Sequence, residues 1–121
     1  MSLLKPHEKI RQGHLEKLMD QIKKDGCVKN PIIVDKNTMI ILDGHHRFNS
    51  LKIMGIKLIP VCLIDYRDEA VTVGAWRKGE KVTKDEVVAA GLSGKLLNPK
   101  TSHHMIPNRP MGLKIPLADL K

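Results

Sequence analysis

The first clear hydrophobic pattern of the chain lies in the range 14–25. Apolar residues recur there at positions 15, 18, 19 and 22, and charged or amide side chains fill most positions between them. This spacing of three and four residues predicts an amphipathic helix over 14–25 that buries one face. Gly26 is expected to end this helix, because glycine adopts the left-handed conformation of a helix end without steric cost.

Short apolar runs with β-branched residues follow the helix. The runs 31–35 and 39–42 are separated by a few polar residues, which predicts two strands joined as a hairpin. The range 57–66 predicts a third strand, interrupted by Pro60. Proline cannot donate a hydrogen bond within a sheet, so this strand is expected at a sheet edge or to begin near the proline.

A strand-to-helix corner is predicted where the second strand ends. The pentapeptide Asp43-Gly-His-His-Arg47 follows the apolar run, and Phe48, Leu51 and Met54 then keep a roughly helical spacing until Gly55. The unpaired amides of a first helical turn point toward one spot and attract anions. The corner is therefore predicted to bind phosphate.

The side chains of this corner support a phosphate site. Gly44 allows a ligand to approach the backbone closely, and Arg47 offers a planar set of donors that matches phosphate oxygens. His45 and His46 add donors whose charge can vary. The carboxylate of Asp43 repels phosphate unless it holds Mg²⁺ or a substrate hydroxyl, and its alternative role is a helix cap.

The second half of the chain predicts one more helix and then an irregular segment. Thr83 and Glu86 have the spacing of a capping box, which predicts a helix over 84–90 that ends at Gly91. Three prolines in the range 98–112 exclude a long helix there. This range also gathers hydroxyl, histidine and arginine side chains, so it is either a surface tail or an anion-binding loop.

The composition of the chain is that of a globular domain. It has 121 residues, of which 41% are hydrophobic and 28% charged, so we expect one domain over 1–121. Its apolar runs are much shorter than the ~20 residues that cross a bilayer. The N-terminal residues lack the pattern of a secretory signal peptide. These features predict a cytoplasmic protein.

Charge and cysteine content narrow the class of partner. A formal net charge of +8 favours an anionic partner, without deciding between nucleic acid and nucleotide. The chain has one Trp, one Tyr and one Phe, too few for many base-stacking surfaces, which disfavours an RNA-binding module. Cys27 and Cys62 are too few for a disulfide framework and are expected to be small buried side chains.

Spacing excludes several common site types. The adjacent pairs His45-His46 and His103-His104 lack the spacing of a zinc site, so tight zinc binding is not expected. The chain also lacks the glycine-rich loops of P-loop, protein-kinase and Rossmann enzymes. A nucleotide site in this chain therefore needs a different architecture.

The order of these motifs resembles one superfamily. The range 26–34, the hairpin and Leu42-Asp-Gly-His-His-Arg47 are similar to the ParB/sulfiredoxin-like fold, whose members place such a corner on nucleotide phosphates. Within that superfamily the chain most resembles the free serine kinases, which have further motifs similar to the ranges 4–8, 73–77, 99–104 and 107–112. The resemblance implies an α+β single domain with a small mixed sheet and flanking helices.

The resemblance also implies an activity. Free serine kinases phosphorylate L-serine itself, so the expected reaction transfers a phosphoryl group from ADP or ATP to the serine hydroxyl and gives O-phospho-L-serine. The expected partners are L-serine and an adenine nucleotide, with Mg²⁺ as cofactor and no membrane. The range 78–98 is much shorter than the matching segment of the larger archaeal members, which predicts either a compact active form or a form that has lost its function.

Site residues follow from the same resemblance. Glu8 is implied as the base that accepts the serine proton, with Glu16 as the alternative, and Asp43 as the second catalytic carboxylate and the Mg²⁺ ligand. The implied nucleotide- or phosphate-binding residues are Gly44, His45, His46, Arg47, Lys100 and His104, and the implied serine-binding residues are Trp76, Thr101, Ser102 and His103. The proline-rich segment of about 94–121 is thus expected to contribute to the active site.

Three other functions are compatible with part of the pattern. The main alternative is a ParB-like nucleotide-binding module or switch that acts with DNA; such proteins carry a helix-turn-helix, for which the range 88–121 is too rich in proline and glycine. Sulfiredoxin activity needs a reactive cysteine in the corner, where this chain has His45. The third is a nucleotide sensor without turnover. These motifs predict neither the oligomeric state nor the choice between ADP and ATP.

Overall fold

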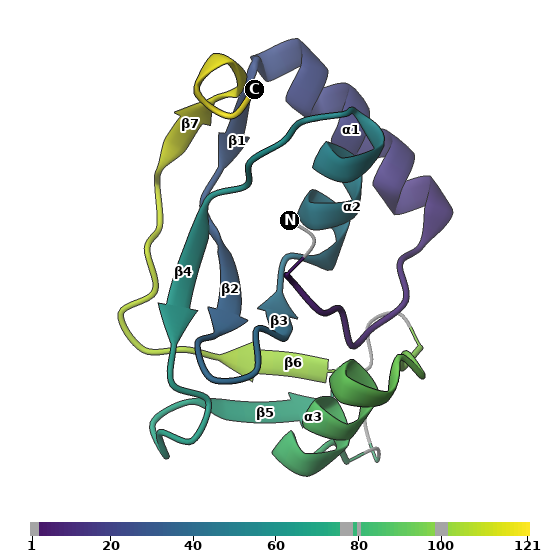
Figure 1. Ribbon diagram of the computed structural model, residues 1–121, viewed down its shortest axis with the longest axis vertical. Helices are drawn as coiled ribbons and strands as arrows, with labels where there is room; N and C mark the ends of the chain where they lie inside the picture. The colour runs from purple at the N-terminus through teal and green to yellow at the C-terminus, as the bar shows by residue number, and fades with distance from the viewer. Residues whose placement is uncertain (1–2, 76–78, 80, 99–101) are drawn as a thin grey trace.

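The computed structural model describes residues 3–75, 79, 81–98 and 102–121, which form a mixed arrangement of helices and small sheets (Figure 1). The helices are α1 (Gln12–Asp25), α2 (His45–Ile53), α3 (Lys84–Ser93) and the 3-10 helix η1 (Leu117–Asp119). The strands are β1 (Cys27–Lys29), β2 (Ile32–Asp35), β3 (Ile41–Asp43), β4 (Val61–Ile64), β5 (Thr72–Ala75), β6 (Ser102–Met105) and β7 (Lys114–Pro116). This architecture confirms the predicted α+β class.

A three-stranded sheet in the order β3-β2-β4 forms the centre of the fold. β2 and β3 pair antiparallel, which confirms the predicted hairpin, and β4 lies parallel to β2 on its other side. All four residues of β2 are buried, as its apolar composition predicts. β4 takes the predicted edge position and begins directly after Pro60, so it is shorter than the predicted range 57–66.

Two further strand pairs join the C-terminal segment to the rest of the fold. β1 pairs with β7 and β5 pairs with β6, both antiparallel, and the β5–β6 pair crosses below the central sheet in Figure 1. These strands were not predicted, because each has only three or four residues and none is a continuous apolar run. The alternative of a surface tail is wrong for the range 102–105, where Ser102 and His104 are buried within β6.

The ends of the first and third helices follow local rules. α1 begins two residues before the predicted start, and Gly26 ends it with a φ of 65°, as predicted. α3 begins at the predicted cap, where the amide of Glu86 donates a hydrogen bond to the hydroxyl of Thr83. The end of α1 and the start of α3 could be predicted because the residues that set them lie next to the helix.

The predicted end of α3 at Gly91 is wrong. The helix continues to Ser93, and Gly94 ends it with a φ of 76°. Gly91 serves packing instead, since a Cβ at this position would lie 2.7 Å from the side chain of Ile40. The sequence could not distinguish a glycine that ends a helix from one that lets a helix approach a neighbouring segment.

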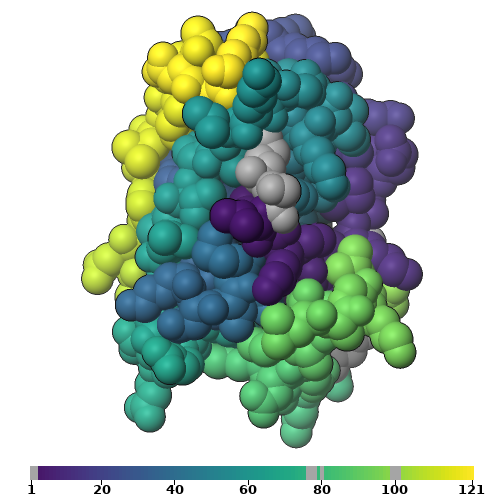
Figure 2. All heavy atoms as spheres, in the orientation of Figure 1, coloured from purple at the N-terminus to yellow at the C-terminus, as the bar shows by residue number. Residues whose placement is uncertain are grey.

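The N-terminal segment crosses one face of the molecule between α2 and α3 (Figures 1 and 2). Lys5 forms a parallel bridge with Ile40, just before β3, and Glu8 forms one with Leu97, ahead of β6. These bridges place the range 5–8 beside segments that are far away in the sequence.

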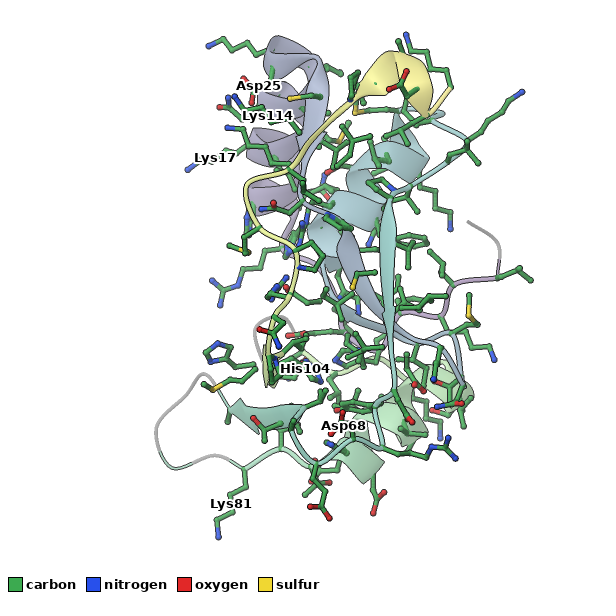
Figure 3. All side chains as sticks on the ribbon, turned by 90° about the vertical axis from the view of Figure 1, so that its left-hand side faces the viewer. Lys17, Asp25, Asp68, Lys81, His104 and Lys114 are labelled. Carbon is green, nitrogen blue, oxygen red and sulfur yellow. The ribbon has the colours of Figure 1, made fainter. Side chains whose placement is uncertain are left out.

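Three apolar clusters hold the elements together. They lie between the sheet and α3, between α1, α2 and β1, and between the β2–β3 hairpin and α2. Lys17 and Lys81 point outward, whereas His104 lies inside the molecule (Figure 3). The two cysteines are half-buried and unpaired. In the part of the chain that the structure describes, no helix is long and apolar enough to cross a membrane.

Candidate active site

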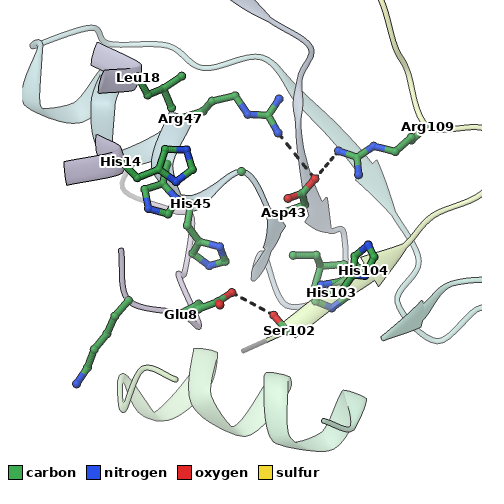
Figure 4. A pocket seen from close by; sticks show the side chains of 14 residues that line it. Glu8, His14, Leu18, Asp43, His45, Arg47, Ser102, His103, His104 and Arg109 are labelled. Atoms are coloured by element: carbon green, nitrogen blue, oxygen red, sulfur yellow. Dashed lines mark hydrogen bonds and ion pairs between the residues drawn. The ribbon is translucent and has the colours of Figure 1, made fainter. Parts of the chain in front are cut away.

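A pocket of about 430 Å³ lies where the end of β3, the beginning of α2, one face of α1 and β6 meet (Figure 4). Its lining residues are Glu8, Lys9, His14, Leu18, Leu42, Asp43, Gly44, His45, His46, Arg47, Ser102, His103, His104 and Arg109. The pocket therefore brings together the predicted base, the whole predicted corner and three predicted residues of β6.

The predicted strand-to-helix corner is present, and we call the range 43–47 the phosphate corner. Gly44 separates β3 from α2 with a φ of 102°. A Cβ there would lie 2.4 Å from Cγ2 of Ile32, so neither the backbone conformation nor the space accepts a larger residue. The N-cap of α2 is Gly44, and no described side chain caps the helix, so the alternative role of Asp43 as the cap is wrong.

The first turn of α2 presents backbone donors to the pocket. The amide of Phe48 makes an early hydrogen bond of the helix, to the carbonyl oxygen of Gly44. The amides of His45, His46 and Arg47 precede this bond, and all three residues line the pocket. Together with the positive end of the helix dipole, these amides give the phosphate corner the geometry of an anion site.

Two arginines flank the carboxylate of Asp43 (Figure 4). Its Oδ2 accepts a hydrogen bond from Nη2 of Arg109 at 2.5 Å and lies 3.8 Å from Nη2 of Arg47. Burial raises the pKa of Asp43, but the hydrogen bond and charge of Arg109, with help from Arg47, outweigh burial and lower the pKa overall. The carboxylate is therefore ionised at neutral pH.

The sequence indicated Arg109 only as one of the polar side chains of the alternative anion-binding loop, and it was not assigned a role in the site. Its sequence signal was weak, because it lay in a proline-rich range with several other cations and hydroxyls. Its Nε is buried and has no hydrogen-bond partner among the described residues. A buried donor without a partner costs ~1 to 3 kcal/mol, so an anion bound beside Arg109 would remove this cost.

One terminal nitrogen of Arg47 donates to the backbone, and the other faces the pocket. Its Nη1 donates to the carbonyl oxygens of Lys29, Asn30 and Pro31 at distances of 3.2, 3.0 and 3.3 Å. Burial lowers the pKa of Arg47, while the charge of Asp43 raises it. The guanidinium remains charged at neutral pH, and its Nη2 lies on the side of Asp43.

Glu8, the predicted base, lines the same pocket from the N-terminal segment and is only 9% exposed. The hydroxyl oxygen of Ser102 lies 3.1 Å from Oε2 of Glu8 and 2.9 Å from Nε2 of His7. Glu16, the alternative base, is exposed on α1 and does not line the pocket. The geometry thus favours Glu8 over Glu16.

Three buried histidines surround this end of the pocket. Burial lowers the pKa of His7 to about 4, that of His104 to about 3, and that of His45 well below its ordinary value. All three rings are neutral at pH 7, so His45 is not the donor of variable charge that its sequence position suggested. Its Nε2 instead accepts a hydrogen bond from the amide of His7 at 3.2 Å. His7 was not predicted, although it stands next to Glu8.

His104 makes its ring contacts within the protein. Its Nε2 lies 2.8 Å from the hydroxyl of Tyr66, and the ring also hydrogen-bonds to the backbone of Leu42. Burial raises the pKa of Tyr66, so its hydroxyl stays protonated and donates to His104. His104 supports the pocket wall through these bonds, and its direct contact with nucleotide stays a prediction.

The opposite wall of the pocket comes from α1. The rings of His14 and His46 stack with their centroids 4.1 Å apart, and Leu18 lies on the same side (Figure 4). The amide of Arg11 donates to Nε2 of His46 at 3.0 Å. His14 and Leu18 were not predicted as site residues, because the pattern of α1 indicated only a packing face. They give the pocket a flat, partly apolar side.

Three predicted site residues, Trp76, Lys100 and Thr101, lie outside the described residues, and their assigned roles stay predictions. His103 is described, is half-buried and lines the pocket. The structure therefore brings His103 and Ser102, of the predicted serine-binding group, to the same wall as Glu8.

The described residues fit Mg²⁺ only in combination with a nucleotide. No group of three or more His, Cys, Asp or Glu side chains that could hold a metal occurs in the described ranges. Proteins often bind Mg²⁺ through one or two carboxylates, with phosphate oxygens and water as the other ligands. Asp43 can supply one such carboxylate beside the helix amides. The nucleotide phosphates and water would then supply the other ligands of Mg²⁺.

The sequence matches known proteins over about two thirds of its length. Residues 1–76 match the ParB N-terminal domain. A ParB-like protein from Sulfolobus acidocaldarius is 41% identical over 75 residues, which are 62% of this chain and 37% of that protein. An ATP-dependent L-serine kinase from Staphylothermus marinus is 42% identical over 77 residues, which are 60% of this chain and 31% of that protein.

A further relative differs in its nucleotide. The ADP-dependent L-serine kinase SerK from Thermococcus kodakarensis is 33% identical over 89 residues, which are 70% of this chain and 37% of that protein. The matched part spans about a third of the length of these curated relatives. A solved free serine kinase in complex with AMP has a TM-score of 0.88 at 19% identity, over 99% of this chain and 91% of that one. This likeness confirms the predicted fold.

Proposed function

The chain belongs to the ParB N-terminal domain family, and on this premise we propose that it is a kinase for free L-serine. In the proposed reaction a phosphoryl group passes from ADP or ATP to the serine hydroxyl, and O-phospho-L-serine is released. The observation that carries this proposal is that two carboxylates, Glu8 and Asp43, line one pocket together with the helix amides of the phosphate corner. Such a pocket can hold an anionic phosphate and an alcohol at the same time.

The phosphate corner is the proposed binding site for the transferred group. Phosphoryl transfer depends mainly on positioning and on neutralising the charge of the phosphate oxygens. In the proposal the amides of the first turn of α2 hold these oxygens, and Arg109 and Arg47 add positive charge beside them. Mg²⁺ bound by Asp43 and the nucleotide would neutralise further phosphate charge. Lys100 is proposed to act on this side as well.

Glu8 is proposed to act on the acceptor. A serine hydroxyl is a poor nucleophile at neutral pH, and a carboxylate within hydrogen-bond distance can accept its proton as the new bond forms. The burial of Glu8 in the pocket wall supports this role. His103, Trp76 and Thr101 are proposed to hold the amino acid next to it.

The phosphoryl donor is either ADP or ATP. Among the relatives, the Staphylothermus protein is named an ATP-dependent kinase and the Thermococcus protein an ADP-dependent kinase. Both nucleotides offer phosphates that the helix amides can bind. The assay below therefore uses each of them separately.

The second candidate function is a nucleotide-binding module that acts with DNA. The net charge of +8 and the similarity to a ParB-like protein favour it. Within the described residues, the chain after position 88 forms the end of α3, then β6, β7 and η1, and no helix-turn-helix. A DNA-acting module would bind a DNA duplex in a nucleotide-dependent way, which the kinase proposal does not require.

The direct test is the reaction itself. The protein is incubated with Mg²⁺, L-serine and either ADP or ATP, and O-phosphoserine is measured by mass spectrometry. Asp43→Asn is the matched control, because Gly44 rather than Asp43 is the N-cap of α2. We expect product with the wild type and a rate lower by ~10²-fold or more with Asp43→Asn. Nucleotide binding without any O-phosphoserine would contradict the kinase and favour the binding module.

A further inference from the structure

Glu8, Ser102 and His7 form a continuous chain of buried polar groups in the pocket wall. The Ser102 hydroxyl oxygen lies 3.1 Å from Oε2 of Glu8 and 2.9 Å from Nε2 of His7. On its other side, Nδ1 of His7 lies 2.6 Å from the carbonyl oxygen of Ile41. Glu8, Ser102 and His7 are 9%, 7% and 0% exposed, so water has little access to these bonds.

The hydrogens in this chain of hydrogen bonds can be assigned one by one. A carbonyl oxygen only accepts, so Nδ1 of His7 carries a hydrogen and donates it to Ile41. Burial lowers the pKa of His7 to about 4, although the bond to Ile41 raises it, so the ring is neutral at pH 7. Its Nε2 then has a lone pair and needs a donor. Among the described residues, the only hydrogen between Nε2 and Oε2 of Glu8 is that of the Ser102 hydroxyl.

That single hydrogen is required by two acceptors. When Glu8 is ionised, both its Oε2 and Nε2 of His7 accept, and Ser102 can donate to only one of them. When Glu8 carries a proton, it donates to Ser102, Ser102 donates to His7, and every contact in the chain is paired. Proton uptake by Glu8 therefore gains a buried hydrogen bond, and hydrogen bonds made by the protonated form favour protonation.

Resting on the proposed kinase function, we propose that His7 is a positioning residue that acts through Ser102 to make Glu8 a better proton acceptor. In the reaction, a bond forms between the serine oxygen and phosphorus, and the bond from phosphorus to the leaving oxygen of the nucleotide breaks. The serine proton moves to Glu8, and the electron pair of the broken bond leaves with the nucleotide oxygen. Ser102 turns its hydrogen from Glu8 to His7, so it is a bridge in the wall rather than the predicted serine contact.

The other ionisable groups around Glu8, Ser102 and His7 do not compete for the proton of the substrate serine. The His45 and His104 rings lie 4.6 and 5.7 Å from the His7 ring, and burial lowers the pKa of both. Asp43 is ionised beside Arg109 at the phosphate corner, and Lys9 and His103 line the pocket. The proton taken from the substrate therefore resides on Glu8 rather than on a neighbouring buried histidine.

Two substitutions at His7 separate this role from packing. The amide nitrogen of asparagine overlays Nδ1 of histidine, so His7→Asn keeps a donor for Ile41 and removes the acceptor for Ser102. The longer glutamine reaches the position of Nε2, so His7→Gln keeps an acceptor for Ser102 and loses the donor for Ile41. A purely structural His7 predicts little change in Glu8 protonation with either variant.

Two measurements are made on these variants. The first is the dependence of kcat on pH for O-phosphoserine formation, and the second is the protonation of Glu8 followed by ¹³C NMR of labelled glutamate, assigned with Glu8→Gln. Loss of one buried hydrogen bond in His7→Asn should move both the acid limb of kcat and the Glu8 titration to lower pH by ~0.4 to 1 unit. We expect His7→Gln to retain the wild-type midpoints and nucleotide KM to be unchanged in both variants.

The NMR titration does not need turnover, so the two proposals fail separately. A lower Glu8 midpoint in His7→Asn, without any O-phosphoserine from the wild type, supports the coupling and contradicts the kinase. Equal Glu8 midpoints in wild type and folded His7→Asn overturn the coupling, as does a larger shift in His7→Gln. If His7→Asn does not fold, Ser102→Thr and Ser102→Ala give a second comparison: the coupling predicts a lower midpoint of the Glu8 titration in Ser102→Ala only, and an equal or higher midpoint there overturns it.

Discussion

The two sides of the pocket are built in different ways. The phosphate corner is a continuous pentapeptide, in which a strand end, a glycine and a helix start follow one another along the chain. The side of Glu8 joins residues 94 positions apart, since Ser102 reaches it from β6. An anion site can thus be specified locally, whereas a supported base needs the N-terminal segment and β6 to be placed beside each other first.

Glu8→Gln tests the side that the tertiary structure assembles. Glutamine keeps the size of the side chain but cannot accept the serine proton, so we expect kcat to fall by ~10²-fold or more with little change in nucleotide affinity. Glu16→Gln is the matched control, because Glu16 is exposed on α1 outside the pocket, and it should keep full activity. Full activity of the Glu8→Gln protein would show that Glu8 is not the base.

Gly44→Ala tests whether the corner depends on local geometry. The positive φ and the close approach of Ile32 should together lower the free energy of unfolding by ~2 to 4 kcal/mol. Gly26→Ala is the control, because Gly26 has a φ of 65° but open space around it, so only the backbone cost of ~1 to 2 kcal/mol is expected. Chemical denaturation measures both. If Gly44→Ala and Gly26→Ala lose the same free energy of unfolding, the contact with Ile32 does not stabilise the corner.

Arg47→Ala should act on affinity rather than on the chemical step. Loss of a charged donor beside the helix amides is expected to weaken nucleotide binding roughly tenfold to hundredfold, measured by calorimetry. Arg67→Ala controls for the change in net charge, since the Arg67 side chain is 78% exposed and is not part of the pocket lining. Unchanged affinity in a folded Arg47→Ala protein would place the phosphates elsewhere.

The buried histidines should make stability depend on pH. An unfolded histidine has a pKa of 6.5, whereas burial lowers that of His7 to about 4 and that of His104 to about 3. The unfolded chain therefore binds more protons below pH 6.5, and the free energy of unfolding should fall as pH drops, by up to ~1.4 kcal/mol per pH unit for each histidine. Denaturation at pH 7 and pH 5 tests this. His7→Asn should reduce the slope, and equal stability at both pH values would contradict the burial of neutral rings.

Features that depend on neighbouring residues were predicted well. The period of α1, the end at Gly26, the buried β2 and the corner at Gly44 each follow from residues within a few positions of one another. The strands β1, β5, β6 and β7 were missed, because each is short and is defined by a partner far along the chain. Gly91 was misread for the same reason, since its role depends on Ile40.

The chemistry available to the protein follows from its residue types and local motifs: an anion-binding corner, two candidate carboxylates and a pair of histidines near the C-terminus. Long-range packing sets how these groups are used. It buried Glu8 but left Glu16 exposed, paired Asp43 with Arg109, and placed neutral His7 behind Ser102. Local rules of backbone sterics and hydrogen bonding act over a few residues, whereas burial and long-range pairing exist only after distant segments have packed together.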